Sequence, residues 1–306
     1  MKNYKFFVVM IVMGIIIESG VLAQSSGDFI FEQIPMTKAV MLGVFLDNPG
    51  LTIATLVGYT GDAAKVEIPS NCVITIPEKQ GTVGSTKPLK VVAIENAFMS
   101  YQRLTSVVIP STVKIIGINA FNGCTSLTSI AIPNSVTKIG VAAFRNCKSL
   151  TSISIPTSVT EIERNAFSLC NDLTSITIPN NVKKIGAGAF MQCSNLKSIA
   201  IPDSVNEFGM QSFSGCTNLA SIDLPNSITK IDTGMFKDCT SLKSIKIPKS
   251  VSAINKGAFS GCSSLAKITL EDGAMIKIAK DAFKGVPTLD EQTQNALIAA
   301  GYKGKF

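Results

Sequence analysis

The chain has 306 residues, of which 46% are hydrophobic, and a formal net charge of +7. This is enough apolar material for a folded core. The sequence contains no His, which excludes Ser-His-Asp and Cys-His catalysis and any metal site with His ligands. Most general acid–base enzymes also use His, so we expect no enzyme, no catalytic residues, no cofactor and no metal site.

Residues 1–23 have the order of a secretory signal peptide. Two lysines precede an apolar run over residues 6–17, and Val21 and Ala23 occupy the small-residue positions before a cleavage point. A membrane anchor is the alternative, but a spanning helix needs about 20 apolar residues, and Glu18 interrupts this run early. We expect cleavage after Ala23 and no membrane span in the mature chain. The protein would then be exported, either extracellular or at the cell surface, with the periplasm as an alternative.

Residues 24–93 lack the regularity of the rest of the chain. They hold two strand-like runs, at 51–57 and 72–77, separated by turn-forming residues. Runs of this kind between turn signals indicate β-structure. We therefore expect a β-rich N-terminal cap that merges into the first coil near Val91.

One pattern recurs through residues 94–285. A Phe is followed three residues later by a Cys, and the pair returns every 23 residues. A fixed period of this length indicates a solenoid, here of about eight to nine coils. The predicted structural ladder consists of Phe121, Phe144, Phe167, Phe190, Phe213, Phe236 and Phe259 with Cys124, Cys147, Cys170, Cys193, Cys216, Cys239 and Cys262.

The remaining positions of the repeat predict the course of each coil. Within residues 150–155, Leu150, Ile153 and Ile155 lie on one side and Ser152 and Ser154 on the other, which is typical of a short strand with one buried face. Pro156 ends the strand, because proline has no N–H for a ladder. Strands of successive coils should pair in parallel as a continuous sheet, and residues 165–170 should form a short turn of helix. The predicted fold is a repeat solenoid, a right-handed coil with a parallel β-sheet along one face and short helical turns on the other.

Residues 286–306 are predicted to form a C-terminal capping helix and tail. Thr288 and Glu291 have the spacing of a capping box, and Gly301 suits the end of a helix. Because no coil can bury its own apolar side chains alone, a stack of coils needs caps at both ends.

The recurring cysteines are too regular for disulfides. Cysteines of exported proteins usually pair, but this column of seven leaves one over. A disulfide also needs Cβ atoms about 3.8 Å apart, closer than neighbouring strands lie. No two of these cysteines have metal-ligand spacing. We expect a buried column of inert, reduced thiols.

The repeat resembles the BspA-like, or Treponema pallidum-type, leucine-rich repeat family. The blocks IGVAAFRNCKSLTSISIPTSVTE (139–161) and IDTGMFKDCTSLKSIKIPKSVSA (231–253) carry the resemblance, which covers roughly residues 50–306. Tyr101 stands where the other repeats have Cys. The resemblance implies a leucine-rich repeat fold and an exported or surface protein of bacteria. Some family members are adhesins that bind host matrix proteins or other microbes, and the family has no shared catalytic residues.

The outward side chains of the predicted sheet form a candidate binding surface, which we call the strip. The extended face is the usual binding surface of repeat proteins. Ser and Thr are also good polar strand residues, which leaves a purely structural role open. The strip residues are Thr128, Ser129, Thr151, Ser154, Thr174, Thr177, Lys197, Asp223, Lys243 and Lys246.

These features predict an exported, non-enzymatic binding protein, an adhesin-like module at the cell surface that recognises a host or microbial protein or glycan through the strip. A periplasmic or envelope structural protein that assembles with copies of itself is the alternative. The lysines near the C-terminal end of the strip would attract an acidic partner or form a solvated face. Nucleic-acid binding is not expected, because aromatic residues are not interleaved with the basic ones.

Overall fold

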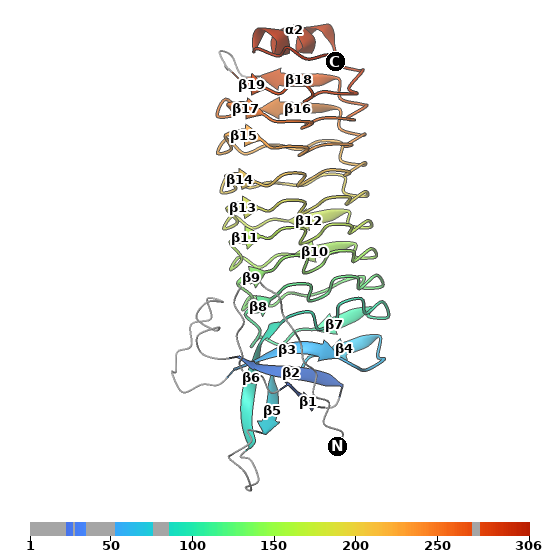
Figure 1. The fold of residues 1–306 in the computed structure, drawn as a ribbon, viewed down its shortest axis with the longest axis vertical. Coiled ribbons are helices and arrows are strands. Elements are labelled where there is room, and N and C mark those ends of the chain that lie inside the picture. The colour runs from blue at the N-terminus through green and yellow to red at the C-terminus, as the bar shows by residue number, and fades with distance from the viewer. Residues whose placement is uncertain (1–22, 27, 35–52, 76–85, 271–275) are drawn as a thin grey trace, which may run out of the picture.

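The computed structural model describes residues 23–26, 28–34, 53–75, 86–270 and 276–306. These residues form a long stack of coils with a β-rich region at its N-terminal end and a helix across its C-terminal end (Figure 1). The predicted signal peptide, except for Ala23, lies outside the described residues. Within the described ranges, no helix is long and apolar enough to cross a membrane.

The N-terminal end of the stack is β-rich, as predicted. It comprises β1 (Ala23–Ser26), β2 (Phe29–Ile34), β3 (Ile53–Tyr59), β5 (Asn71–Thr75) and β6 (Thr86–Ile94). β2 pairs antiparallel with β1 and β3, whereas β6 pairs in parallel with β3 and antiparallel with β5. The end of β6 then pairs with the following coil, Ala93 opposite Ile115. The irregular region and the regular stack therefore share one sheet.

Each coil also contributes a very short strand to a wall that the sequence did not predict, which we call the KI wall. It consists of β8 (Ile115–Ile116), β9 (Lys138–Ile139), β11 (Glu161–Ile162), β13 (Lys184–Ile185), β14 (Glu207–Phe208), β15 (Lys230–Ile231), β17 (Ala253–Ile254) and β19 (Lys277–Ile278). The strands from β8 to β14 continue the sheet of β6, and β15, β17 and β19 form a separate parallel sheet. Ile139, Ile162 and Ile185 are fully buried behind this wall.

The strands that the sequence did predict form the other wall, which we call the TSI wall (Figure 1). Its parallel pairs are β4 (Lys65–Glu67) with β7 (Ser106–Val108), β10 (Ser152–Ser154) with β12 (Ser175–Thr177), and β16 (Ser244–Ile247) with β18 (Lys267–Leu270). A bridge from Thr177 to Ala200 extends the middle pair. The expected continuous sheet is thus a series of short parallel sheets. β4 lies within the segment that the sequence assigned to the N-terminal cap.

The segment that carries Phe forms hydrogen-bonded turns and does not continue as a helix. In the coil around Phe167, Asn165 and Leu169 have φ values of +56° and +64°, and equivalent positions recur along the stack. A helix needs negative φ at successive residues, so these positions interrupt it. The N–H groups instead reach the next coil: Asn165 donates to the carbonyl oxygen of Ala187 at 2.9 Å. Phe167 and Leu169 donate in the same way at 2.8 Å.

A column of Phe rings fills the centre of the stack. From Phe98 to Phe283, successive ring centroids lie 5.3–5.7 Å apart with interplanar angles of at most 16°. The rings are buried in every coil. A tyrosine closes each end, because Tyr59 packs on Phe98 and Tyr302 packs edge-on against Phe283.

The seven cysteines of the repeats form a second interior column. All are free and buried. Each thiol donates a hydrogen bond of 3.0–3.2 Å to the carbonyl oxygen of the Phe that precedes it by 26 residues. Burial raises the pKa of Cys170 to about 12. A thiol with so high a pKa carries almost no thiolate at neutral pH and is therefore unreactive.

The C-terminal cap is helix α2 (Glu291–Ala299), and its predicted capping box is wrong. Asp290 is the N-cap residue, and its carboxylate accepts a hydrogen bond of 2.7 Å from the N–H of Thr293. Thr288 instead donates its hydroxyl proton to the carbonyl oxygen of Leu265. The helix end follows the prediction. Gly301 has a φ of +104°, and Tyr302 N–H donates to Leu297 O at 2.9 Å, as in a Schellman motif.

Candidate functional site

The structure places every strip residue on the exposed side of the TSI wall. The residues between them, such as Ile153 and Ile176, are buried. In the pairing of β10 with β12, Ser154 lies directly opposite Thr177. The short strands thus bring residues 23 positions apart in the sequence side by side on one surface.

Three threonines of the strip, Thr128, Thr151 and Thr174, have a structural role. Thr151 donates its hydroxyl proton to the carbonyl oxygen of Thr128 at 3.4 Å, and Thr174 does the same to Thr151 at 3.2 Å. The N–H groups of these two residues donate to the same carbonyl oxygens. These hydroxyls hold neighbouring coils together. Ser154 and Thr177, by contrast, have no side-chain hydrogen bond within the described part of the chain, so their hydroxyls face solvent.

The outward face of the TSI wall extends the strip toward both ends of the stack, and its chemistry changes along the way. The outward residue at the same place in each coil is in turn Val108, Ala131, Ser154, Thr177, Ala200, Asp223, Lys246 and Thr269. Val108 is 60% exposed. The strip therefore runs from an apolar end beside the N-terminal region to a charged end beside α2.

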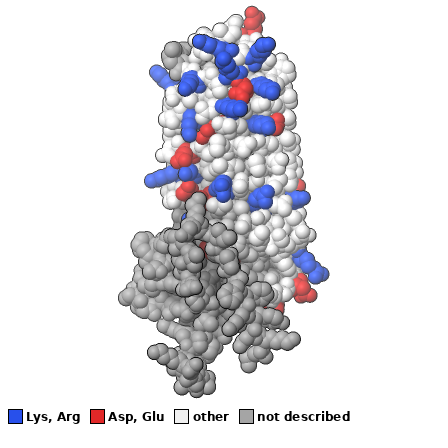
Figure 2. Space-filling model, viewed as in Figure 1, with Lys and Arg blue, Asp and Glu red and all other residues white. Residues whose placement is uncertain are grey.

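The charged end is predominantly basic. Lys243 and Lys246 are joined there by Lys267, which pairs opposite Ser244. Hydrogen bonds from Thr293 lower the pKa of Asp290, and Lys267 adds to this effect. In Figure 2, Lys and Arg gather near the α2 end of the visible face.

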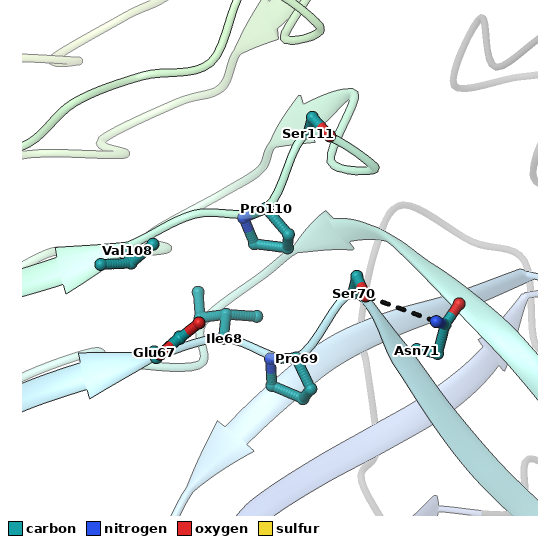
Figure 3. Close-up of a pocket in the computed structure, with 8 residues that line it drawn as sticks. All are labelled: Glu67, Ile68, Pro69, Ser70, Asn71, Val108, Pro110 and Ser111. Carbon is teal, nitrogen blue, oxygen red and sulfur yellow. Dashed lines mark hydrogen bonds between the residues drawn. The ribbon is translucent and has the colours of Figure 1, made fainter.

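A shallow hollow of about 500 Å³ adjoins the apolar end of the strip (Figure 3). It lies where the chain leaves β4 and β7. The lining residues are Glu67, Ile68, Pro69, Ser70, Asn71, Val108, Pro110 and Ser111. Asn71 donates an amide proton to the hydroxyl oxygen of Ser70 at 3.3 Å. Glu67 and Val108 belong both to the hollow and to the outward face of the TSI wall, so a partner on the strip could also reach into the hollow.

The outward face of the KI wall is occupied by ion pairs. Lys184 lies 3.6 Å from Glu161 and 3.1 Å from Glu207, and hydrogen bonding to Glu207 raises the pKa of Lys184. Lys230 pairs with Asp232 at 3.0 Å. Sequence reasoning missed these pairs. The signal was available, since Lys and Glu alternate there at the 23-residue period.

The described residues hold no group of three or more Cys, Asp or Glu side chains that could bind a metal ion. The cysteines lie in a straight column with high pKa values and donate to carbonyl groups, as described above. The arrangement can present an extended surface to a partner.

The comparisons with known proteins agree with this architecture. The model of the family described as BspA type leucine rich repeat region matches residues 93–216 and 183–298, in six copies. A solved leucine-rich repeat protein from Bacteroides ovatus is 31% identical with a TM-score of 0.51, and the match covers 77% of this chain and 55% of that one. This chain therefore spans about half the length of that protein.

Two further solved structures are more distant. The T. pallidum leucine rich repeat protein is 25% identical with a TM-score of 0.41, over 83% of this chain and 90% of that one. A leucine rich cell surface protein from Faecalibacterium prausnitzii is 23% identical with a TM-score of 0.35, over 93% and 99%. No curated protein matches the sequence.

Proposed function

Because the chain belongs to the BspA-type leucine-rich repeat family, we propose that it is an exported, non-enzymatic binding protein, an adhesin-like module that recognises a host or microbial protein or glycan through the strip. The family is a repeat scaffold and not a known enzyme family. Leucine-rich repeat proteins generally mediate protein interactions, which supports a macromolecular partner.

The observation that carries the proposal is the combination of a constant interior with a changing strip. The Phe and Cys columns repeat from coil to coil, but the outward residue of the TSI wall passes from Val108 through Ser154 to Lys246. If the outward residues served only to stack the coils, they would not need to differ from coil to coil. A surface that varies along a rigid wall can match one large partner at several points.

The location at the cell surface is part of the same proposal. The apolar run over residues 6–17, with small residues before Ala23, supports export. Protease treatment of whole cells that express the full chain tests this. Loss of the protein from intact cells supports surface exposure. Protection until the cell envelope is opened would favour the periplasmic alternative.

The binding surface is tested with a double substitution, Ser154→Arg with Thr177→Arg. Both side chains point outward, and Lys246 occupies the equivalent place in another coil, so a long basic side chain fits there without disturbing the fold. Purified protein is first screened on immobilised matrix proteins and glycans. For any partner that binds at micromolar concentration, we expect the double variant to bind at least tenfold more weakly.

The matched control is Thr137→Arg with Thr160→Arg, directly before β9 and β11 of the KI wall. Lys114 and Lys183 take the equivalent place in other coils, so this change also adds two basic side chains without strain. It should leave binding unchanged. Equal loss in both variants, or no partner at micromolar concentration, contradicts the proposal. Concentration-dependent oligomers that only the strip variant abolishes would instead assign the strip to self-assembly.

A further inference from the structure

A second hollow lies at the C-terminal end of the stack, and none of its lining residues belongs to the strip. Its volume is about 320 Å³. The lining residues are Lys280, Asp281, Lys284, Lys303, Gly304 and Lys305. Four lysines thus surround one carboxylate, and all four are exposed. The hollow combines residues of the last coil with residues of the tail that follows α2.

Gly285 directly follows the lining residue Lys284, and its backbone is oriented by the fold. In the coil before it, the N–H groups of Phe259 and Gly261 donate to the carbonyl oxygens of Ala282 and Lys284, at 2.8 and 3.0 Å. Gly285 occupies the place of Gly261 in the last coil and has a similar φ, +74° against +77°. Its N–H should therefore point along the stack toward the C-terminal end. Within the described residues, this N–H has no hydrogen-bond acceptor.

The tail after α2 supplies a hydrogen-bond acceptor for the N–H of Phe283 but not for the N–H of Gly285. The hydroxyl of Tyr302 donates to the carbonyl oxygens of Lys280 and Lys305, at 3.1 and 2.8 Å. Burial and the nearby Asp281 carboxylate raise the pKa of Tyr302, and a hydrogen bond from the N–H of Phe283 opposes them. Tyr302 thus supplies the acceptor that a further coil would offer to Phe283. The N–H of Gly285 remains available next to Lys284.

We propose that this hollow, which we call the terminal cradle, binds a phosphate or sulfate group. Four lysines beside one outward backbone N–H, that of Gly285, offer an anion both positive charge and hydrogen-bond donors. A Lys ammonium is a compact charge with three donors, which suits a tetrahedral oxyanion, whereas a planar carboxylate is better matched by the fork of Arg. No Arg lines the cradle. The site is separate from the strip, so it stands whether or not the proposed function holds.

The test is a titration of the full protein with inorganic phosphate and with sulfate at low salt, followed by calorimetry and by the NMR signal of the Gly285 amide. We expect saturable binding to one site, a shift of the Gly285 signal, and an affinity that falls as salt is added. The variant Lys280→Gln with Lys303→Gln should bind at least tenfold more weakly. Both residues are exposed, so unchanged circular dichroism will verify the fold.

The matched control is Lys243→Gln with Lys246→Gln, which removes the same charge from the strip. It should keep the affinity for phosphate within about twofold, since it lies on another face. Equal weakening in both variants, binding that does not saturate, or an unmoved Gly285 signal would overturn the proposal. Parallel titrations with a phosphomonoester and a sulfated disaccharide distinguish an esterified phosphate or sulfate group from the free ion as the ligand. Tighter binding of an ester than of the free ion assigns the cradle to a polymer or lipid headgroup, and the reverse assigns it to the free ion.

Discussion

Inside the stack, each coil from Phe98 to Phe283 places the same ring at the same point, whereas the outward residue of the TSI wall changes from Val108 to Ser154 to Lys246. The interior must repeat, because each ring packs on the ring of the next coil. The strip has no such neighbour on its outer side. The contrast separates two kinds of position: identical interior residues maintain the fold, whereas outer residues can change from coil to coil without disturbing it.

Raising the pH into the alkaline range should lower the stability of the protein through the buried thiols of its interior. Burial raises the pKa of Cys170 to about 12, while an unfolded thiol titrates near about 8.5. A group with a raised folded pKa gives its full stabilisation below the unfolded pKa and loses it as the pH rises toward the folded value. The urea midpoint should therefore fall steeply between about pH 9 and 12. A Cys170→Ala, Cys193→Ala variant should show a shallower fall, and a parallel curve would refute this role of the thiols.

The Phe column should give the largest effect of a single substitution. Phe167→Ala removes a fully buried ring that stacks on two others at 5.5 and 5.6 Å. We expect a loss of about 3–5 kcal/mol in the free energy of unfolding, measured by urea denaturation. Thr177→Ala, on the strip, serves as the comparison and should change stability by less than about 0.5 kcal/mol. Similar losses at both positions would remove the distinction between interior and strip.

The close approach of coils beside the KI wall should give an intermediate effect. A Cβ added to Gly209 would lie 2.2 Å from the backbone nitrogen of Ala187, so two coils would have to move apart. Gly209→Ala should cost about 1–3 kcal/mol in the same urea assay. Glu163→Ala is the control, because that residue holds an equivalent place two coils earlier and already carries a Cβ. If Gly209→Ala left the free energy of unfolding unchanged, the coils would have to separate easily at this place.

The ion pairs of the KI wall should give the smallest effect. Lys184→Met removes both contacts, to Glu161 and Glu207, but the lysine side chain is 40% exposed. Exposed pairs contribute about 0.2–1 kcal/mol, and at 1 M salt the loss should nearly vanish because charges are screened. Lys183→Met, next to it, is the matched control. A loss that persists at high salt would mean that packing of the lysine stem, and not its charge, stabilises the wall.

The parts of the fold that follow from regular spacing could be predicted from the sequence. The Phe column, the buried face of the TSI strands and the helix end at Gly301 each leave a pattern in the residues themselves. The KI wall could not be predicted in this way, since strands of two residues show no alternation. The positive φ of Leu169 was also hidden, because only the hydrogen bonds between coils make that conformation favourable at a non-glycine residue.

The candidate site likewise combines features that the sequence predicts with features that it does not. The exposure of the strip follows from the alternation of Ile153 with its neighbours. That Thr151 uses its hydroxyl on the preceding coil depends on the distance between coils, which no single repeat encodes. The choice of Asp290 as the helix cap likewise depends on where α2 docks, with the hydroxyl oxygen of Thr293 accepting the N–H of Ile268. The spacing of residues in the sequence favoured Thr288 as the helix cap, because spacing alone carries no information on where α2 docks.

The alternation of charge on the KI wall matters for a chain made of almost interchangeable units. A misfolded stack that looped out one unit would still set ring on ring and thiol on thiol, so the interior would not oppose the error. On the KI wall, looping out the Lys184 unit would place Glu161 beside Glu207, and looping out the Glu161 unit would place Lys138 beside Lys184. Like charges at these places would destabilise the pairing. Between Lys138 and Lys230, charges on the outside of the molecule therefore favour the correct order of the units.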